Sequence, residues 1–598
     1  MLMKLTMANI KSHLRDYIVL LTGLVMSSAI FYMFANLATN EALIKSDLNF
    51  KFASVVFIFG LILLAIITLV YVMYANQFLL NMRQHDYGLF MMLGAKKSRV
   101  SQLLVLETMV IGLGATVIGI IIGILATGGL SGWLLGNLGL TIHHFNPVYP
   151  KAILVTLALF LALFFIAAML NLQRMIKTPV LKLLKQADTV DRVNFKPVRL
   201  VVQAILGIGL LAVGYWAMDS ITTLQLLSVP IAIVTITIGS YLIFRAVILL
   251  ILNLIKKTNW ATKGLNDFTI SQIMFRVRDY TKILTITSLL FAMALGAITV
   301  GAGFRRDIPL IANNTSAYTL AINDPDATQT KQLKQLTDAN QITYQQKFAD
   351  NKVYYLQSEL QKNPFKEAIP SNKPQAKAHY RNVSVDKLTQ NQQYEFAMLS
   401  GKKQTLKAQF LSTGEFSPIK APVQRVILVK VKSIPANYQV LNKLNKSQNS
   451  KHPSAMPEIT FGSFNTYLLS ISIFGGLEFV GYFLGIAFLA MLASCLMFKI
   501  LAGATQDQIR YRMLAKIGTR RSLLKRSIDS EILVLFALPG ALGIVDVLFG
   551  LKLFKPLMAD PYNHIGWIIA GFGVIYLGYY LLTIWLYQML VLPAKNKH

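Results

Sequence analysis

Two stretches of this chain, QHDYGLFMMLGAKKSRVSQLLVLE (84–107) and QIRYRMLAKIGTRRSLLKRSIDSE (508–531), follow one pattern without gaps. The aligned pairs are Tyr87 and Tyr511, Gly94 and Gly518, Lys96 and Arg520, Lys97 and Arg521, Ser98 and Ser522, and Glu107 and Glu531. Each stretch leads directly into a long apolar run. Such an internal repeat is typical of membrane proteins built from two equivalent halves.

A second pair of segments supports the duplication. TMANIKSHLRDYIVLLT (6–22) resembles TISQIMFRVRDYTKILT (269–285), but at an offset of 263 positions instead of 424. The difference of 161 positions predicts an insertion in the second copy, between the helix that carries the RDY motif and the next helix. A polar block lies at that place.

The composition indicates an integral membrane protein. Hydrophobic residues make up 54% of the 598 positions and charged residues only 14%, and a run of about 20 apolar residues spans a bilayer. Ten such runs occur, at 17–37, 53–75, 103–128, 152–172, 200–217, 227–253, 282–303, 467–498, 532–553 and 565–590. The first has no small-residue cleavage pattern after it, so we interpret it as a retained helix and not as a signal peptide.

The net charge of +31 is concentrated in alternate loops. Basic residues crowd the segments before the first run, between 83 and 99, from 174 to 199, from 256 to 282 and from 499 to 526, whereas 129–151 and 218–226 hold almost none. This is the positive-inside pattern, and it predicts that both termini are cytoplasmic. The pattern also disfavours nucleic-acid binding as the reason for the charge.

Two segments that precede spanning runs, 1–16 and 266–279, are predicted to be helices lying on the cytoplasmic face, with apolar residues on one side. Arg15-Asp16 and Arg278-Asp279 then mark the inner boundary of a span. Anchoring by charges that reach the interface explains these pairs, and coupling to a cytoplasmic partner is the alternative.

The run 53–75 continues without a strong helix breaker toward Tyr87. A helix from Phe52 to Arg83 would measure roughly 48 Å, longer than the hydrocarbon core of about 30 Å, so it should protrude into the cytoplasm. A short separate helix, Tyr87 to Leu93, should then end at Gly94 as its C-cap glycine. It would present an apolar patch suited to a groove on a partner, formed by Leu89, Phe90, Met91 and Met92.

Four charged residues stand inside or near apolar runs. Glu107 and Glu531 lie one or two turns into their helices, where the helix dipole favours a carboxylate; their recurrence also suggests an ion pair with a basic loop residue. Arg245 is a functional candidate as an intramembrane charge; the alternative is that its side chain reaches the inner interface, since it is close to Lys256. Glu478 is harder to explain; it faces a cavity, meets an arginine or contacts substrate.

A protruding helix, a motif like xYGLxxxLGAxxxxI and a glycine-rich apolar helix resemble the FtsX-like permease domain of ABC transporters. The ten-helix plan with one large insert is similar to the permeases of bacitracin- and antimicrobial-peptide-resistance transporters, the BceB type. The resemblance implies the following organisation: 1–52, an interfacial helix and the first span; 53–172, a first FtsX-like domain; 173–265, a linker with spans five and six; 266–303, an interfacial helix and span seven; 304–466, an extracellular domain; 467–598, a second FtsX-like domain.

The resemblance also implies a function. Two cytoplasmic loops would receive an ATPase, through Tyr87, Gly88, Leu89, Phe90, Leu93, Gly94, Tyr511, Met513, Ile517 and Gly518. The chain has no G-x-x-x-x-G-K-[ST] pattern, so we expect ATP and Mg to bind a separate ATPase subunit in two copies, and no catalytic, cofactor or metal site here. Further implied partners are a sensor histidine kinase, a peptide antibiotic and an undecaprenyl-pyrophosphate-type lipid.

The block 304–466 is predicted to fold as an α+β domain. Apolar alternation in SAYTLAI, ITYQQKF, VYYL and VQRVILVKV indicates strands, and 327–338 reads as a helix. Lys and Arg outnumber Asp and Glu by 22 to 11 between Arg305 and Thr466, which suits an anionic partner; a solvated surface without special meaning is the alternative.

Two other functions stay open. One is a related FtsX-like permease that acts in lipoprotein release or in control of a wall hydrolase. The other is an ion-coupled secondary transporter, which requires charged or broken helices near the midplane of both halves. Position 54, which corresponds to Glu478, is Ser, and this disfavours the second alternative.

Overall fold

The computed structural model describes residues 14–41, 48–137, 146–177, 179, 197–259, 265–369, 379–385, 388–400, 407–451 and 461–592. Ten helices in these ranges are long and apolar enough to cross a membrane, which confirms the ten predicted runs and the predicted fold class. The predicted surface helix 1–16 lies outside the described residues except for its last three positions, which begin the helix α2 (Leu14–Thr39).

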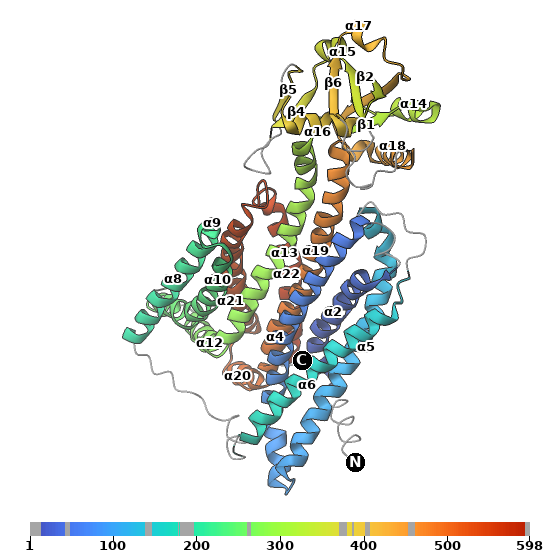
Figure 1. The fold of residues 1–598 in the computed structure, drawn as a ribbon. Coiled ribbons are helices and arrows are strands. Elements are labelled where there is room, and N and C mark those ends of the chain that lie inside the picture. Colours follow the sequence, from blue (N-terminus) through green and yellow to red (C-terminus); the bar gives the residue numbers. More distant parts are fainter. Residues whose placement is uncertain are drawn as a thin grey trace.

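The first helical bundle contains four long helices, which pack around one core (Figure 1). They are α2 (Leu14–Thr39), α4 (Leu48–Met92), α5 (Lys97–Asn137) and α6 (Pro150–Lys177). Phe31 of α2 meets Phe160 of α6 edge to face, with ring centroids 5.9 Å apart. Tyr32 donates a hydrogen bond to the Pro147 carbonyl just before α6, at 2.6 Å.

The second helical bundle repeats this order of elements. It consists of α13 (Thr281–Thr315), α19 (Ser463–Ala502), α20 (Ala504–Lys516), α21 (Arg521–Gly550) and α22 (Ile565–Val591), with a short 3-10 turn, η4 (Leu551–Phe554), before α22. The two bundles meet along α19, where Phe34, Phe57 and Phe479 form one aromatic cluster. Deeper in this interface Tyr71 donates to Ser494 Oγ at 2.9 Å.

Two further spans stand beside the second bundle (Figure 1). They are formed by α8 (Pro197–Asp219), the short turns α9 (Ile221–Leu224) and η1 (Gln225–Leu227), α10 (Ser228–Leu242), a π-helical segment η2 (Ile243–Val247) and α11 (Ile248–Lys256). Tyr215 stacks on Phe549 with centroids 4.1 Å apart and donates to Asp546 Oδ1 at 2.6 Å. The remaining faces expose Val, Ile and Leu side chains, as expected for helices in contact with lipid.

The protruding helix differs from the sequence prediction. The predicted short helix from Tyr87 to Leu93 is not separate, because α4 runs unbroken from Leu48 to Met92 over 45 residues, roughly 67 Å. No glycine or proline interrupts it between Gly60 and Gly88. In the second copy the helix does break, at Gly503, where the first copy has Leu79. Glycine is a poor helix former, so α20 becomes a separate arm.

Helices α13 and α19 form a stalk that rises out of the bundles into a β-sheet unit (Figure 1). α19 alone is 40 residues long, roughly 60 Å. Glycines let the two backbones approach closely: a Cβ built on Gly481 would lie 2.4 Å from the Ala297 carbonyl oxygen, and one on Gly301 would lie 3.0 Å from the Glu478 carbonyl oxygen.

The sheet unit, residues 316–462, connects the two stalk helices. Its five-stranded sheet has the order β1-β7-β2-β3-β6, with β3 and β6 parallel and the other pairs antiparallel. The strands are β1 (Leu320–Asn323), β2 (Ala339–Ala349), β3 (Lys352–Leu356), β6 (Lys407–Leu411) and β7 (Gln424–Val431), and a separate hairpin is formed by β4 (Lys366–Ile369) and β5 (His379–Asn382). The helices are α14 (Ala327–Leu333), α15 (Gln357–Lys362), α16 (Gln390–Leu399), α17 (Thr413–Phe416) and α18 (Tyr438–Lys451), with a 3-10 turn η3 (Pro435–Asn437).

One hydrophobic core joins the sheet unit to the stalk. Ile308 and Ala312 of α13 and Ile471 of α19 pack in the same buried cluster as Ile322 of β1 and Val429 of β7. The sheet is therefore held by the stalk through side-chain packing as well as through the chain connections.

Candidate functional site

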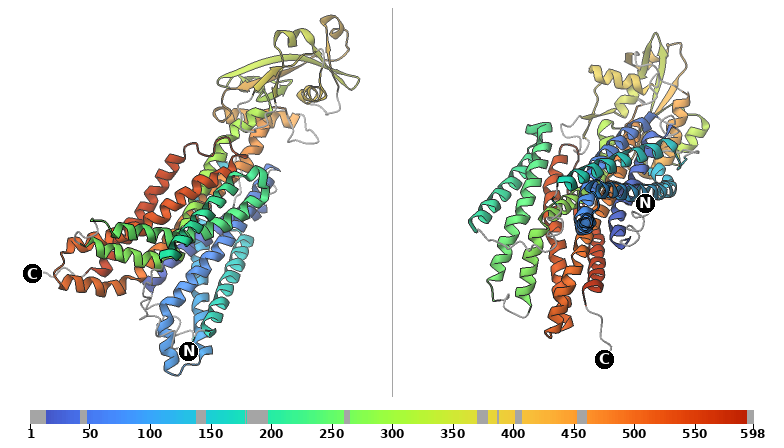
Figure 2. Two further views of the ribbon diagram at one scale, coloured as in Figure 1. Left: turned by 90° about the vertical axis from the view of Figure 1, so that its left-hand side faces the viewer. Right: turned by 90° about the horizontal axis from the view of Figure 1, so that it is seen from below.

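Two helical hairpins occupy the end of the molecule away from the sheet unit. The first hairpin comprises residues 87–107, at the α4–α5 turn, and the second comprises residues 511–531, at the α20–α21 turn. In Figure 1 the α4–α5 turn is the point farthest from the sheet, and in the left view of Figure 2 it is the lowest point of the molecule. These are the two stretches that repeat in the sequence.

Both turns close with the same backbone hydrogen bonds. In the first hairpin Ala95 N donates to the Phe90 carbonyl at 2.9 Å and Gly94 N to the Met91 carbonyl at 3.2 Å. In the second, Thr519 N donates to Leu514 and Gly518 N to Ala515, each at 3.1 Å. This is the Schellman pattern, which needs a left-handed residue. Gly94 and Gly518 both have φ +93°.

The tip of each hairpin exposes apolar side chains. Leu93 is 85% exposed and its counterpart Ile517 is 81% exposed. Leu89 and its counterpart Met513 are also exposed, as is Met92. Exposed clusters of this kind mark interaction surfaces.

The structure divides the apolar patch predicted for the first hairpin. Leu89, Met92 and Leu93 point outward, whereas Phe90 and Met91 are partly buried. The two inner residues pack in a small core with Tyr87, Val100, Leu103, Leu104 and Met175. Gly88 is buried at this contact, and its counterpart Arg512 is exposed. Phe90 therefore packs partly against the inner core of the hairpin, whereas Leu89, Met92 and Leu93 are its exposed apolar residues.

The same tyrosine–glutamate hydrogen bond ties the two arms of each hairpin together. Tyr87 donates to Glu107 Oε2 at 3.0 Å, and Tyr511 donates to Glu531 Oε1 at 3.0 Å. All four side chains are buried. The repeat thus preserves a buried polar contact as well as a chain path, and this contact joins the two helices of each hairpin.

A buried charge network centred on Arg276 of α12 (Asn266–Asp279) contacts the second hairpin at Glu531. Arg276 Nη2 lies 2.7 Å from Asp507 Oδ2 and 3.1 Å from Glu531 Oε2. The Tyr587 hydroxyl accepts from Arg276 and donates to Asp507, both at 2.6 Å. Burial alone would lower the pKa of the Arg276 guanidinium, but these neighbours raise the pKa well above its ordinary value. The network fastens α12 and α22 to the second hairpin.

Arg276 is absent from the site residues that the sequence predicts. The predicted helix 266–279 has the same bounds as α12, and the prediction of an ion pair for Glu531 is confirmed, but its partner is a helix residue and not a loop residue. The helical spacing of Arg276 indicates that it is buried. It follows Ile273 by three residues and Thr269 by seven, which places it on the buried face of an amphipathic helix.

The other two intramembrane charges lie apart from the hairpins. Glu478 is buried in the stalk, and Arg305 Nη1 of the facing helix lies 3.5 Å from Glu478 Oε2. Of the three environments predicted for Glu478, the structure shows the arginine. Arg245 is exposed in the π-helical segment and donates to the Tyr241 hydroxyl at 3.0 Å.

Comparison with known proteins agrees with this architecture. The family described as FtsX-like permease C-terminal matches residues 58–180, which cover most of α4 and all of α5 and α6. The ABC transporter permease protein YxdM of Bacillus subtilis is 23% identical over 615 residues, covering 96% of this chain and 97% of YxdM.

Two more relatives are bacitracin export permease proteins named BceB. The protein from Bacillus subtilis is 23% identical and the one from Halalkalibacterium halodurans is 24% identical, each over 50% of this chain and 47% of the relative. The repeated hairpins, the ten candidate spans and these similarities lead to one conclusion: the chain is an FtsX-like ABC transporter permease related to YxdM and BceB, a membrane subunit that works with a separate ATPase.

Proposed function

We propose that this permease gives resistance to cell-wall-targeting antimicrobial peptides of the bacitracin type. ATP hydrolysis on a partner subunit would move the two hairpins, and the stalk would carry that motion to the sheet unit, which removes the peptide from its lipid target or expels it. The observation that carries the proposal is the matched exposure of Leu93 and Ile517 at the tips of two hairpins with the same internal contacts.

The exposed apolar tips suit grooves on two ATPase copies. Burying one Leu or Ile side chain is worth about 1.5–3 kcal/mol, and two equivalent tips bind two equivalent subunits. Exposed Lys96, Arg99, Arg520 and Arg521 surround the tips. By the positive-inside rule we assign this end to the cytoplasm and the sheet unit to the outside.

Three further partners belong to the proposal. The relatives named for bacitracin export support a peptide antibiotic, together with an undecaprenyl-pyrophosphate-type lipid, as the extracellular ligand. A sensor histidine kinase is proposed from family resemblance.

A complementation assay tests the proposal. In a strain without the gene, the wild-type chain should restore resistance to bacitracin-type peptides. A Leu93→Asp/Ile517→Asp double variant should not, and it should lose the ATPase during co-purification while remaining in the membrane. Gln102→Ala, an exposed position on the same hairpin, serves as the control and should behave as wild type.

The possible results of this assay distinguish the proposed function from its alternatives. Unchanged peptide susceptibility on deletion, with the ATPase still bound, would favour lipoprotein release or wall-hydrolase control. Full ATPase binding by the double variant would overturn the assignment of the hairpin tips.

A further inference from the structure

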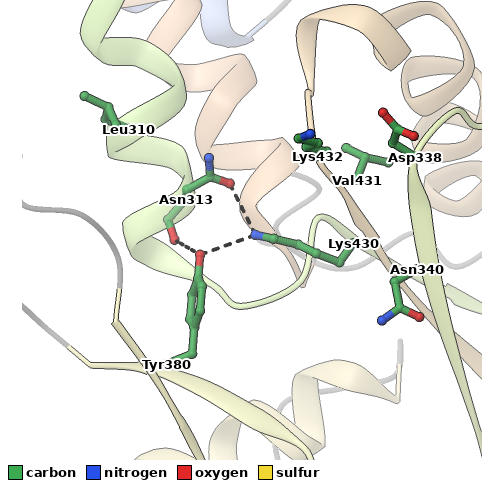
Figure 3. A pocket seen from close by; sticks show the side chains of 8 residues that line it. All are labelled: Leu310, Asn313, Asp338, Asn340, Tyr380, Lys430, Val431 and Lys432. Atoms are coloured by element: carbon green, nitrogen blue, oxygen red, sulfur yellow. Dashed lines mark hydrogen bonds between the residues drawn. The ribbon is translucent and has the colours of Figure 1, made fainter.

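An open pocket lies where the sheet unit meets the stalk. It has a cavity volume of about 450 Å³, within the range of about 300–1,000 Å³ for small-ligand sites. Its walls come from α13, from the β5 strand, from the start of β2 and from the end of β7 (Figure 3). The residues that line it are Leu310, Asn313, Asp338, Asn340, Tyr380, Lys430, Val431 and Lys432.

The half-buried ammonium of Lys430 lies at the centre of the pocket (Figure 3). It donates to Asn313 Oδ1 and to the Tyr380 hydroxyl, both at 3.3 Å, and lies 5.2 Å from the centre of the Tyr380 ring. No carboxylate of the described residues lies within ion-pair distance of it. Burial lowers the pKa of Lys430. An ammonium that is partly removed from water and held only by neutral groups attracts an anion.

The charges in the walls indicate which kind of anion fits. Lys430 and Lys432 against Asp338 give the pocket one excess positive charge. One carboxylate balances this charge, whereas a phosphate dianion would exceed it and would also be repelled by Asp338. Asp338 in turn suits an N–H donor or an ammonium group of the same ligand. Leu310 and Val431 offer apolar contact to a side chain.

We propose that this pocket binds a free peptide carboxylate, with Lys430 and Lys432 holding the carboxylate and Asp338 accepting an N–H group of the same peptide. The sheet unit would thus recognise a carboxylate with a neighbouring N–H group. Only the statement that this ligand is a peptide rests on the proposed function. Such a carboxylate belongs either to the antimicrobial peptide or to the stem peptide of a cell-wall precursor.

Binding at this place would act on the stalk directly. Tyr380 also donates to the Asn313 carbonyl of α13 at 3.0 Å, so Lys430, Tyr380 and Asn313 link β7, β5 and the stalk helix. A carboxylate on Lys430 competes with Asn313 Oδ1 for the same ammonium. Occupancy of the pocket is thereby connected to the end of α13.

The test uses the full-length permease in lipid nanodiscs and amine acylation read by mass spectrometry. The probes are N-acetyl-alanyl-alanine with a free carboxylate and the same dipeptide as its C-terminal amide. We expect the free acid to slow acylation of Lys430 about tenfold more than the amide does, because a charge-assisted hydrogen bond of about 1.5 kcal/mol corresponds to that factor. Exposed Lys443 on α18 should be acylated at the same rate with either probe.

Three results would overturn the assignment: equal protection by acid and amide, no protection by either, or stronger protection by inorganic phosphate than by the acid. Calorimetry with Lys430→Met should show that the preference for acid over amide is lost, whereas Lys443→Gln should keep it. The same comparison is then made with a stem peptide and with a linear antimicrobial peptide, each as the free acid and as the amide. The natural ligand should show the larger difference in affinity between its acid and amide forms.

This binding test is independent of transport. Retained acid preference in a chain that gives no peptide resistance would contradict the proposed function and leave the pocket assignment intact. Peptide resistance in a chain that shows no preference for the acid would contradict the pocket assignment and leave the proposed function intact.

Discussion

Arg276 Nη2 and Glu531 Oε2 lie 3.1 Å apart, and the two residues are only 3% and 1% exposed. The contact joins the amphipathic helix α12 to the second hairpin at a place where neither charge reaches water. Removing one member of a buried pair leaves an uncompensated charge, which costs more than the pair itself contributes.

We therefore expect Arg276→Met to lower the free energy of unfolding by about 3–5 kcal/mol, because Glu531 and Asp507 both lose their cation. Thermal unfolding in detergent measures this change. The double variant Arg276→Met/Glu531→Gln should be less destabilised than the sum of the single variants. Arg278→Met, two positions along on the exposed side of α12, is the matched control; an equal loss in that variant would contradict the role of the buried pair.

The hairpin glycines give a second prediction. Gly94→Ala and Gly518→Ala should each cost about 1–2 kcal/mol, since a Cβ at positive φ clashes with the backbone. Neither site has a neighbour within 4 Å of the added carbon, so the cost is conformational. Hydrogen exchange of the hairpin amides provides the measurement.

Gly114→Ala in α5 is the comparison for these variants, because it also has open space around it but lies in ordinary helix. It should be neutral or stabilising by about 0.5–1 kcal/mol. Equal effects at all three glycines would exclude a special backbone requirement at the turns.

The packing of the stalk predicts that Gly481 tolerates no larger residue. Gly481→Val would place carbon atoms against the Ala297 carbonyl and push α13 away from α19, at a cost of about 1–3 kcal/mol or more. Gly296→Ala in α13 has nothing within 4 Å and should have little effect. Thermal unfolding gives the melting temperatures of the two variants, and similar values would contradict the close contact between α13 and α19.

Glu395 in the sheet unit makes stability depend on pH. Burial, and then the nearby Glu367 carboxylate, raise its pKa to about 7. The folded state therefore holds a proton that the unfolded state releases above its ordinary value of about 4.5, and the stability of the sheet unit falls as pH rises from about 4.5 to 7. Glu395→Gln should remove this dependence and gain up to about 3 kcal/mol at about pH 8.

Glu415 offers a control of opposite sign, since hydrogen bonds from Ser412 lower its pKa. Its contribution is present above its ordinary pKa and is lost on acidification. Hydrogen exchange of α16 and α17 across the pH range separates the two glutamates. A gain in the protection of α16 on raising the pH of the wild-type chain would contradict the prediction for Glu395.

Much of the architecture follows from the sequence because long apolar runs and alternating strands are local signals. The ten spans, helix 266–279 and the strands in SAYTLAI, ITYQQKF, VYYL and VQRVILVKV are all present. The short elements β4, β5 and β6 carry no such signal. Each has only four or five residues. β4 and β5 pair with each other as a hairpin, whereas β6 pairs in parallel with β3 although two other strands lie between them in the chain, so the pairing of β6 depends on tertiary packing.

The two hairpins of the candidate site can be predicted because they form the repeat in the sequence. The equivalence of Gly94 and Gly518 and of Glu107 and Glu531 identifies both hairpins from the order of residues alone. The Arg276 network is not predictable in this way, because its members lie in α12, α20, α21 and α22, and no local pattern brings 276, 507, 531 and 587 together. Helix α4 is unbroken, whereas the corresponding helix of the second copy breaks at Gly503. This difference between the two copies depends on a single glycine.

The core shared by Ile308, Ala312, Ile322, Val429 and Ile471 packs the ends of the stalk helices directly against the sheet. The two behave as one lever whose long arm is α19, roughly 60 Å. A tilt of about 5° about the end of this helix that is far from the sheet would sweep the other end through about 5 Å. Under the proposed function, a small stroke of the ATPase would be enlarged by the length of this helix alone.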